Sequence, residues 1–177
     1  GPTHRLYRGD PLAPRELVGP GAVAALAPPP MATNEPEQQR RLKLGRWLVR
    51  PDNPLAPRVI ANRLWHYHFG TGLVSTPSDL GGNGTRPSHP LLLDWMAGHL
   101  VETGWSLKSL HRLILTSRAW CQSSRPRADG LAVDSEARLL WRFPPRRLAA
   151  EAIRDGMLVA SGSLNRQMGG PGFKVFE

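Results

Sequence analysis

The distribution of proline constrains the fold of this chain more than any other sequence feature. Seven prolines fall within the first 30 residues, from Pro2 to the Pro28–Pro30 triplet. Each lacks a backbone donor and clashes with the preceding turn of a helix. We therefore predict an extended arm over residues 1–33 and a helical domain over residues 34–177. Because the sequence starts without Met and ends in a glycine-rich run, we expect it to be a piece of a larger multidomain chain.

Start and stop signals divide the rest of the chain into about five helices. The first is expected over residues 35–50. A second follows Asn53-Pro54 and ends at Gly70, because Asn caps helix N-termini, Pro suits the first turn and Gly ends helices. Further helices are expected over residues 90–104, 106–117 and 145–161, with a polar surface loop over residues 122–135. No segment alternates like a strand, so the predicted fold is mainly α, an irregular bundle with a Gly-rich loop.

Composition excludes several classes of protein. Cys121 is the single cysteine, which rules out an internal disulfide framework and cysteine-based metal sites; we expect it in the core or at its boundary. No apolar run reaches the length of a membrane-spanning helix. The net charge is +9, and the arginines are scattered rather than clustered. Binding of polyanions is an alternative function that this charge allows, and nucleic acid is not an expected partner.

A polar stripe on the second predicted helix is the best candidate for a site. Arg58, Asn62 and His66 recur every four residues, so they share one face, and Trp65 and Phe69 flank them. A solvated face more often carries Glu, Lys and Gln. A structural interpretation stays open, in which these residues hold the adjoining Gly-rich loop by hydrogen bonds. The opposite arc, expected to face the core, carries Ile60, Leu64 and Tyr67.

The segment 76–84 and the start of the next helix complete the candidate groove. Asp79 lies among turn-forming residues, where it can contact a ligand or close an Asx turn. His89 precedes the third helix and can exchange a proton near neutral pH. We expect Asp94 to pair with an arginine of another helix. The candidate ligand-binding residues are Arg58, Asn62, His66, Asp79 and His89, and no catalytic residue is assigned.

Metal binding by the His66-x-His68 pair is not expected. On a helix these side chains diverge by about 200°, so they cannot share one ion. We predict no metal site. An enzyme that cleaves polysaccharide remains an alternative, since glycoside hydrolysis needs two carboxylates across a cleft. Asp79 and Asp94 are the central candidates for that pair.

Motifs spread along nearly the whole chain resemble the C-terminal domain of planctomycete-type multidomain proteins, the domain of unknown function 1553 family. They occur in order at Thr3–Asp10, Asn53–Trp65, His68–Val74, Thr76–Gly81, Pro87–Trp95, Gly104–Lys108 and Arg146–Asp155. Such domains commonly lie in exported proteins behind a cytochrome c-like domain. The resemblance therefore implies an extracytoplasmic location and haem on an upstream domain, with no cofactor on this chain. It implies no reaction.

These observations together predict a binding or assembly module with a polar groove. The expected partners are other domains of the same parent chain and a glycan or another anionic ligand. The two alternatives are an enzyme acting on polysaccharide and a polyanion-binding domain. Whether the domain is an enzyme is left open.

Overall fold

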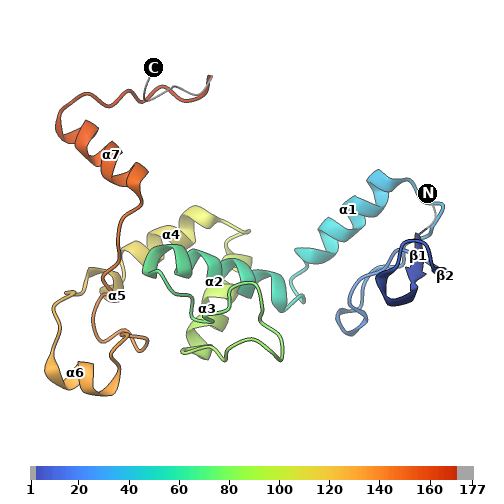
Figure 1. Cartoon of the computed structure of the whole chain (residues 1–177), viewed down its shortest axis with the longest axis horizontal. Coiled ribbons are helices and arrows are strands. Elements are labelled where there is room, and N and C mark those ends of the chain that lie inside the picture. The colour runs from blue at the N-terminus through green and yellow to red at the C-terminus, as the bar shows by residue number, and fades with distance from the viewer. Residues whose placement is uncertain (1–2, 171–177) are drawn as a thin grey trace. The chain divides into compact units, whose positions relative to one another are not determined.

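The computed structural model of the protein describes residues 3–170 and has a mainly α fold, as predicted (Figure 1). The chain divides into two compact units, Gly1–Pro144 and Pro145–Glu177. The division after residue 33 stays a prediction. Within the described residues no helix is both long and apolar enough to cross a membrane. The helices are α1 (Glu37–Leu48), α2 (Leu55–Phe69), α3 (Pro90–Glu102), α4 (Leu107–Leu115), α5 (Arg118–Cys121), α6 (Ala128–Val133) and α7 (Ala150–Ala160).

The N-terminal arm contains a β-hairpin that the sequence did not predict. Strands β1 (Thr3–Leu6) and β2 (Pro14–Val18) pair antiparallel. The turn between them is closed by the Asp10 carboxylate, which accepts a hydrogen bond of 2.9 Å from the Leu12 amide. Both strands of a two-stranded sheet are edge strands. Pro14, which has no amide hydrogen, is therefore tolerated in β2. Two short 3-10 helices, Tyr7–Gly9 and Ala24–Leu26, complete the arm.

An ion pair links the two strands. The Arg5 guanidinium donates to both carboxylate oxygens of Glu16, and these hydrogen bonds lower the pKa of Glu16 below its usual value. The ionised carboxylate therefore stabilises the hairpin above the ordinary pKa of a glutamate. That contribution is lost as the pH falls through the lowered pKa of Glu16.

Replacing Arg5 by Gln should raise the pKa of Glu16 toward its usual value, because the charged donor that favours the carboxylate is removed. The measurement is an NMR titration of the Glu16 side-chain carbonyl carbon in both proteins. Arg8→Gln, on the same arm, serves as the control and should leave the titration of Glu16 unchanged. Identical midpoints in the Arg5→Gln and unmodified proteins would show that the pair is not formed in solution.

The predicted boundaries of the central helices are confirmed within a few residues. Pro54 occupies the cap position of α2 rather than its first turn, and Asn53 before it holds the helix start, since its side-chain oxygen accepts from the Leu55 and Ala56 amides at 3.0 and 3.4 Å. Gly70 ends the helix with φ of 85°, a left-handed conformation that favours glycine. Ser106 caps α4 by accepting from the Ser109 amide.

The chain after α4 differs more from the sequence prediction. Residues 122–135 were expected to form a loop, but they contain α6. Gly130 weakens the helical signal of this segment, yet it lies against the indole ring of Trp141, where an added Cβ would come within 2.6 Å of the ring. The last helix, α7, begins at Ala150 rather than at residue 145. Cys121 is exposed, so the expectation that it lies in the core or at its boundary is wrong.

Helix α2 is the centre of the core and packs against α3 and α4 (Figure 1). Its buried arc differs from the predicted one: Tyr67 is 67% exposed, whereas Asn62 is fully buried among apolar neighbours. The core face is displaced because Asn62 has hydrogen-bond partners inside the protein. The buried core comprises Ala61, Leu64, Trp65, Phe69, Leu73, Val74, Leu93, Met96, Leu100, Leu110 and Ile114.

Two leucines of α3 offer a matched test of this packing. Leu100 is 0% exposed and Leu91 is 83% exposed. Leu100→Ala should lower the free energy of unfolding by about 2–5 kcal/mol, because it leaves a cavity between α2, α3 and α4. Leu91→Ala should change it by less than about 0.5 kcal/mol. Urea denaturation of both variants measures the difference, and equal midpoints would contradict the described core.

Candidate functional site

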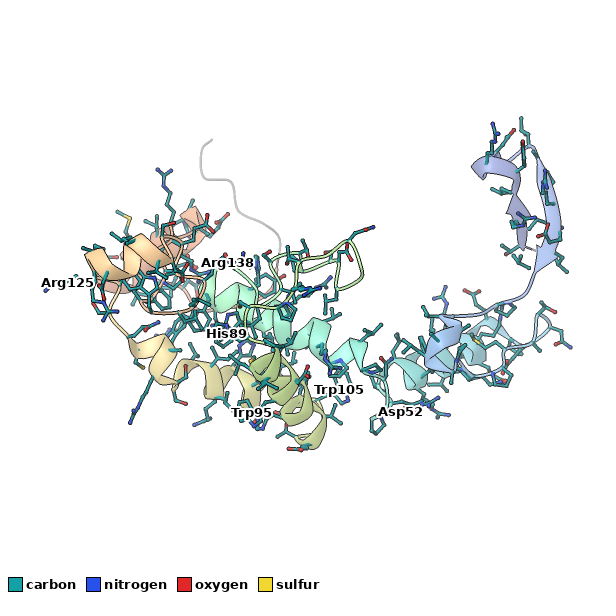
Figure 2. All side chains as sticks on the ribbon, turned by 90° about the horizontal axis from the view of Figure 1, so that it is seen from below. Asp52, His89, Trp95, Trp105, Arg125 and Arg138 are labelled. Carbon is teal, nitrogen blue, oxygen red and sulfur yellow. The ribbon has the colours of Figure 1, made fainter. Side chains whose placement is uncertain are left out.

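A pocket of about 330 Å³ lies at the C-terminal end of α2. Three further segments line it: residues 71–75 after α2, Ser88 before α3, and residues 136–144. Its volume is at the lower end of the range of small-ligand sites. Figure 2 labels His89, which directly precedes α3, and Arg138 of the last lining segment. The site therefore joins segments that are far apart in the sequence.

Aromatic residues form the floor of the pocket. Trp65 and Phe69 stack with ring centroids 4.2 Å apart and are 5% and 3% exposed. Phe69 also contacts Trp120 and Phe143, which lie after α4 and within the last lining segment. Because Phe143 packs directly on Phe69, the 136–144 segment is anchored to the same aromatic cluster that supports the floor. The floor is apolar and close-packed.

Asn62 fixes the loop that follows α2. Its side-chain oxygen accepts from the Val74 amide at 2.9 Å, and its side-chain nitrogen donates to the Val74 carbonyl at 3.0 Å. These two bonds give the buried amide and carbonyl of Val74 the hydrogen-bond partners that a neighbouring β-strand would provide. Gly72 passes so close that an added Cβ would lie 2.5 Å from the Val74 carbonyl and 2.8 Å from the Asn62 oxygen. Only glycine fits at this position of the pocket wall.

The loop in turn holds the start of α3. The Leu73 carbonyl accepts from the Ser88 amide at 2.9 Å and from the Ser88 hydroxyl at 3.3 Å. His89 occupies the cap position of α3, and no side chain caps this helix. Ser88, one residue earlier, lines the pocket.

The outer wall of the pocket is a turn after α6 that is held by hydrogen bonds among its own residues. The Asp134 carboxylate accepts from the amides of Arg138 and Leu139 at 3.0 and 2.7 Å, and its carbonyl accepts from the Trp141 indole at 2.7 Å. Ala137 and Leu140, both lining residues, have φ of 54° and 60°. These left-handed conformations are unfavourable for residues with a Cβ and cluster at functional sites. Strained backbone thus coincides with the pocket.

Two opposite charges line this outer wall. Glu136 and Arg138 are exposed, and within residues 3–170 neither side chain has an ion-pair partner. Thr71, Ser75 and Ser88 add hydroxyl groups to the lining. The pocket therefore combines an apolar floor with one carboxylate, one guanidinium and several hydroxyls.

The candidate residues of α2 have separate environments. The Arg58 guanidinium donates to Asp94 at 2.7 Å and to the Pro54 carbonyl at 2.6 Å. The expected pairing of Asp94 with an arginine of another helix is confirmed, and Arg58 is that arginine rather than a partner of Asp79. His66 has a buried Nδ1 that finds no hydrogen-bond partner among the described residues. Neither Arg58 nor His66 lines the pocket.

The remaining candidates, Asp79 and His89, precede α3. The Asp79 carboxylate accepts from the Gly81 amide at 2.8 Å, an Asx turn, and lines a different cavity beside Arg63. The Nδ1 of His89 lies 3.0 Å from the Ser88 hydroxyl. None of the five candidates lines the pocket. Asn62 and His89 contact segments that do, Asn62 through Val74 in the loop after α2 and His89 through Ser88.

The histidines do not assemble a metal centre. His68 Nε2 lies 2.8 Å from Nδ1 of His111, and the His68 ring also contacts Trp120 of α5. Among the residues that the structure describes, no group of three or more His, Cys, Asp or Glu side chains is placed to hold a metal ion.

The comparisons identify the family of the chain. The family described as a protein of unknown function (DUF1553) matches residues 40–177. The chain belongs to this family. No curated protein and no solved structure matches it. The DUF1553 assignment confirms the sequence resemblance and brings no reaction with it.

Sequence reasoning missed the charged wall of the DUF1553 pocket. Glu136 and Arg138 lie in a stretch without helical or strand periodicity, and no motif singles them out. Ser88 was not among the candidate residues. The one usable signal was Asn62, an amide between apolar positions of an amphipathic helix, which indicates a buried polar group with a specific partner.

The role of Asn62 can be tested by Asn62→Leu. This variant should lower the free energy of unfolding by about 2–4 kcal/mol, because it leaves the amide and the carbonyl of Val74 buried without partners. Arg58→Leu, on the same helix, removes a partly exposed ion pair and should cost at most about 1 kcal/mol. Thermal and urea denaturation give both values. A loss below about 0.5 kcal/mol for Asn62→Leu, the size of an ordinary surface substitution, would contradict the anchoring role.

Proposed function

We propose that this DUF1553 domain is a binding module that takes a neutral, polyhydroxylated ligand, such as a glycan residue, in the pocket after α2. The observation that carries the proposal is the composition of the lining. The lining contains both hydrogen-bond donors and hydrogen-bond acceptors together with an apolar floor formed by Trp65 and Phe69. Sites for small polar ligands commonly combine an apolar surface with a few polar groups that set orientation.

The charges of the pocket favour a neutral ligand over an anion. Glu136 and Arg138 contribute opposite formal charges, so the lining carries no net charge. A carboxylate accepts hydrogen bonds from sugar hydroxyls, and a guanidinium donates to them. A polyanion in this pocket would be attracted by Arg138 and repelled by Glu136, so the two contributions offset each other.

Arginine pairing also argues against the polyanion alternative. Arg5, Arg41, Arg50 and Arg58 each pair with a carboxylate, which engages their guanidinium groups in local contacts. Arg15 and Arg142 lie over the rings of Tyr7 and Trp141. These arginines are distributed over separate elements rather than along one stripe, and polyanion binding depends on such a stripe.

The carboxylates considered for glycoside cleavage serve other contacts. Asp94 pairs with Arg58, and Asp79 closes an Asx turn. Neither lines the pocket, so the proposed binding site does not use them. The family resemblance adds the setting: an exported, cytochrome c-associated parent protein, with haem on an upstream domain and the other domains of that chain as partners. In this proposal the DUF1553 domain holds the parent protein on a glycan.

Titration of the chain with neutral mono- and oligosaccharides, followed by NMR and calorimetry, tests the proposal. Glu136→Gln and Arg138→Gln should each weaken binding by about tenfold or more, because each removes a charged hydrogen-bonding group. Glu37→Gln and Arg41→Gln are the matched controls, since they remove an exposed ion pair on α1. Absence of saccharide-induced shifts at residues 71–75 and 136–140 would overturn the proposal. Salt-sensitive binding to a sulfated glycan alone would favour the polyanion alternative.

A further inference from the structure

We propose that Ser88 and His89 form a nucleophile and base pair, and that the pocket cleaves a carboxylic ester carried by a polyhydroxylated ligand. The proposal rests on the proposed function, because the same pocket must admit that ligand. Ser88 lines the pocket, and its hydroxyl lies 3.0 Å from Nδ1 of His89. Both side chains are half-buried.

This distance satisfies the first requirement of an activated serine. A general base must lie within about 2.6–3.2 Å of the hydroxyl whose proton it accepts. Ser88 lines the pocket and His89 does not, so the base lies outside the residues that would surround a substrate. No GxSxG elbow surrounds Ser88, and the pair is recognised by geometry alone.

The position of Ser88 is held without its side chain. The Ser88 amide donates to the Leu73 carbonyl at 2.9 Å, and Asn62 fixes the neighbouring Val74. The hydroxyl also lies 3.3 Å from the Leu73 carbonyl, a longer contact than that to His89. The hydroxyl does not cap α3, and in the proposed reaction its bond to the Leu73 carbonyl is replaced by one to His89.

The proposed reaction has two balanced steps. The Ser88 oxygen attacks the ester carbonyl carbon while its proton passes to Nδ1 of His89. The bond from that carbon to the alcohol oxygen then breaks, and the alcohol leaves with the proton from His89. A water molecule next attacks the acyl–Ser88 ester and gives a proton to His89. That proton passes to the Ser88 oxygen as the carboxylic acid is released.

Other lining groups suit this ester. Arg138 supplies a positive charge in the pocket for the oxyanion that forms on the carbonyl oxygen. Glu136 and the hydroxyls of Thr71 and Ser75 remain to bind the alcohol part of the substrate. The pocket of about 330 Å³ has room for a small acyl group rather than a long chain.

Two hydrogen arrangements fit the geometry, and they separate the proposal from a purely structural role. In the proposed one, Nδ1 of His89 is unprotonated and accepts from Ser88. In the structural one, Nδ1 donates to the Ser88 oxygen and the hydroxyl donates to the Leu73 carbonyl. Nitrogen-15 NMR of His89 distinguishes the two tautomers. A protonated Nδ1 in the neutral ring would overturn the proposal.

The direct test uses a fluorophosphonate probe and an acetylated sugar on the chain of residues 1–177. The probe should modify Ser88, located by mass spectrometry, and Ser88→Ala should abolish both labelling and ester release. Ser109→Ala is the matched control, because the Ser109 hydroxyl lies 3.0 Å from Nε2 of His99, whereas neither residue lines this pocket. His89→Gln, which keeps Ser88, should slow ester release by about 100-fold or more.

Failure of this inference and of the proposed function give different results. Unmodified sugar that still binds, without labelling of Ser88 or release of acetate, would overturn the ester reaction and leave the binding function intact. Labelling of Ser88 without binding of any sugar would support the nucleophile and overturn the glycan ligand. Equal ester release by Ser88→Ala and the unmodified protein would also overturn the reaction.

Discussion

The double hydrogen bond between Asn62 and Val74 is the interaction on which the site depends. It places an amide group in the middle of an apolar helix face and gives both polar groups of Val74 a partner. The loop after α2 can therefore run through the core without leaving the backbone groups of Val74 unpaired. The preceding carbonyl, that of Leu73, then fixes the start of α3 through Ser88. One side chain thus positions two of the pocket segments.

The helices that have strong local signals were predictable, and the tertiary role of their polar residues was not. Asn53, Gly70 and Ser106 mark real helix ends because capping is a local interaction. The buried face of α2 differs from the predicted one, since periodicity counts Asn62 as polar and Tyr67 as apolar. Burial instead follows the available hydrogen-bond partners, which come from the loop after the helix.

The hairpin and α6 formed although local sequence signals argued against them. Prolines argued against regular structure in the arm, but a two-stranded ribbon tolerates them. Gly130 argued against a helix, but it makes room for the Trp141 ring, a contact that neither helix propensity nor periodicity encodes. Glu136 and Arg138 line a pocket only because Phe143 brings their segment onto Phe69. Contacts of this kind leave no trace in local sequence.

The outer wall of the pocket closes hydrogen bonds within itself and also shares the core. Asp134 accepts from the amides of Arg138 and Leu139, and the Trp141 indole donates to the Asp134 carbonyl. Ala137 is 2% exposed, and Leu140 and Phe143 pack against the buried cluster. Because the wall adds apolar residues to that cluster, the pocket and the core depend on the same contacts, and a substitution in the cluster alters both.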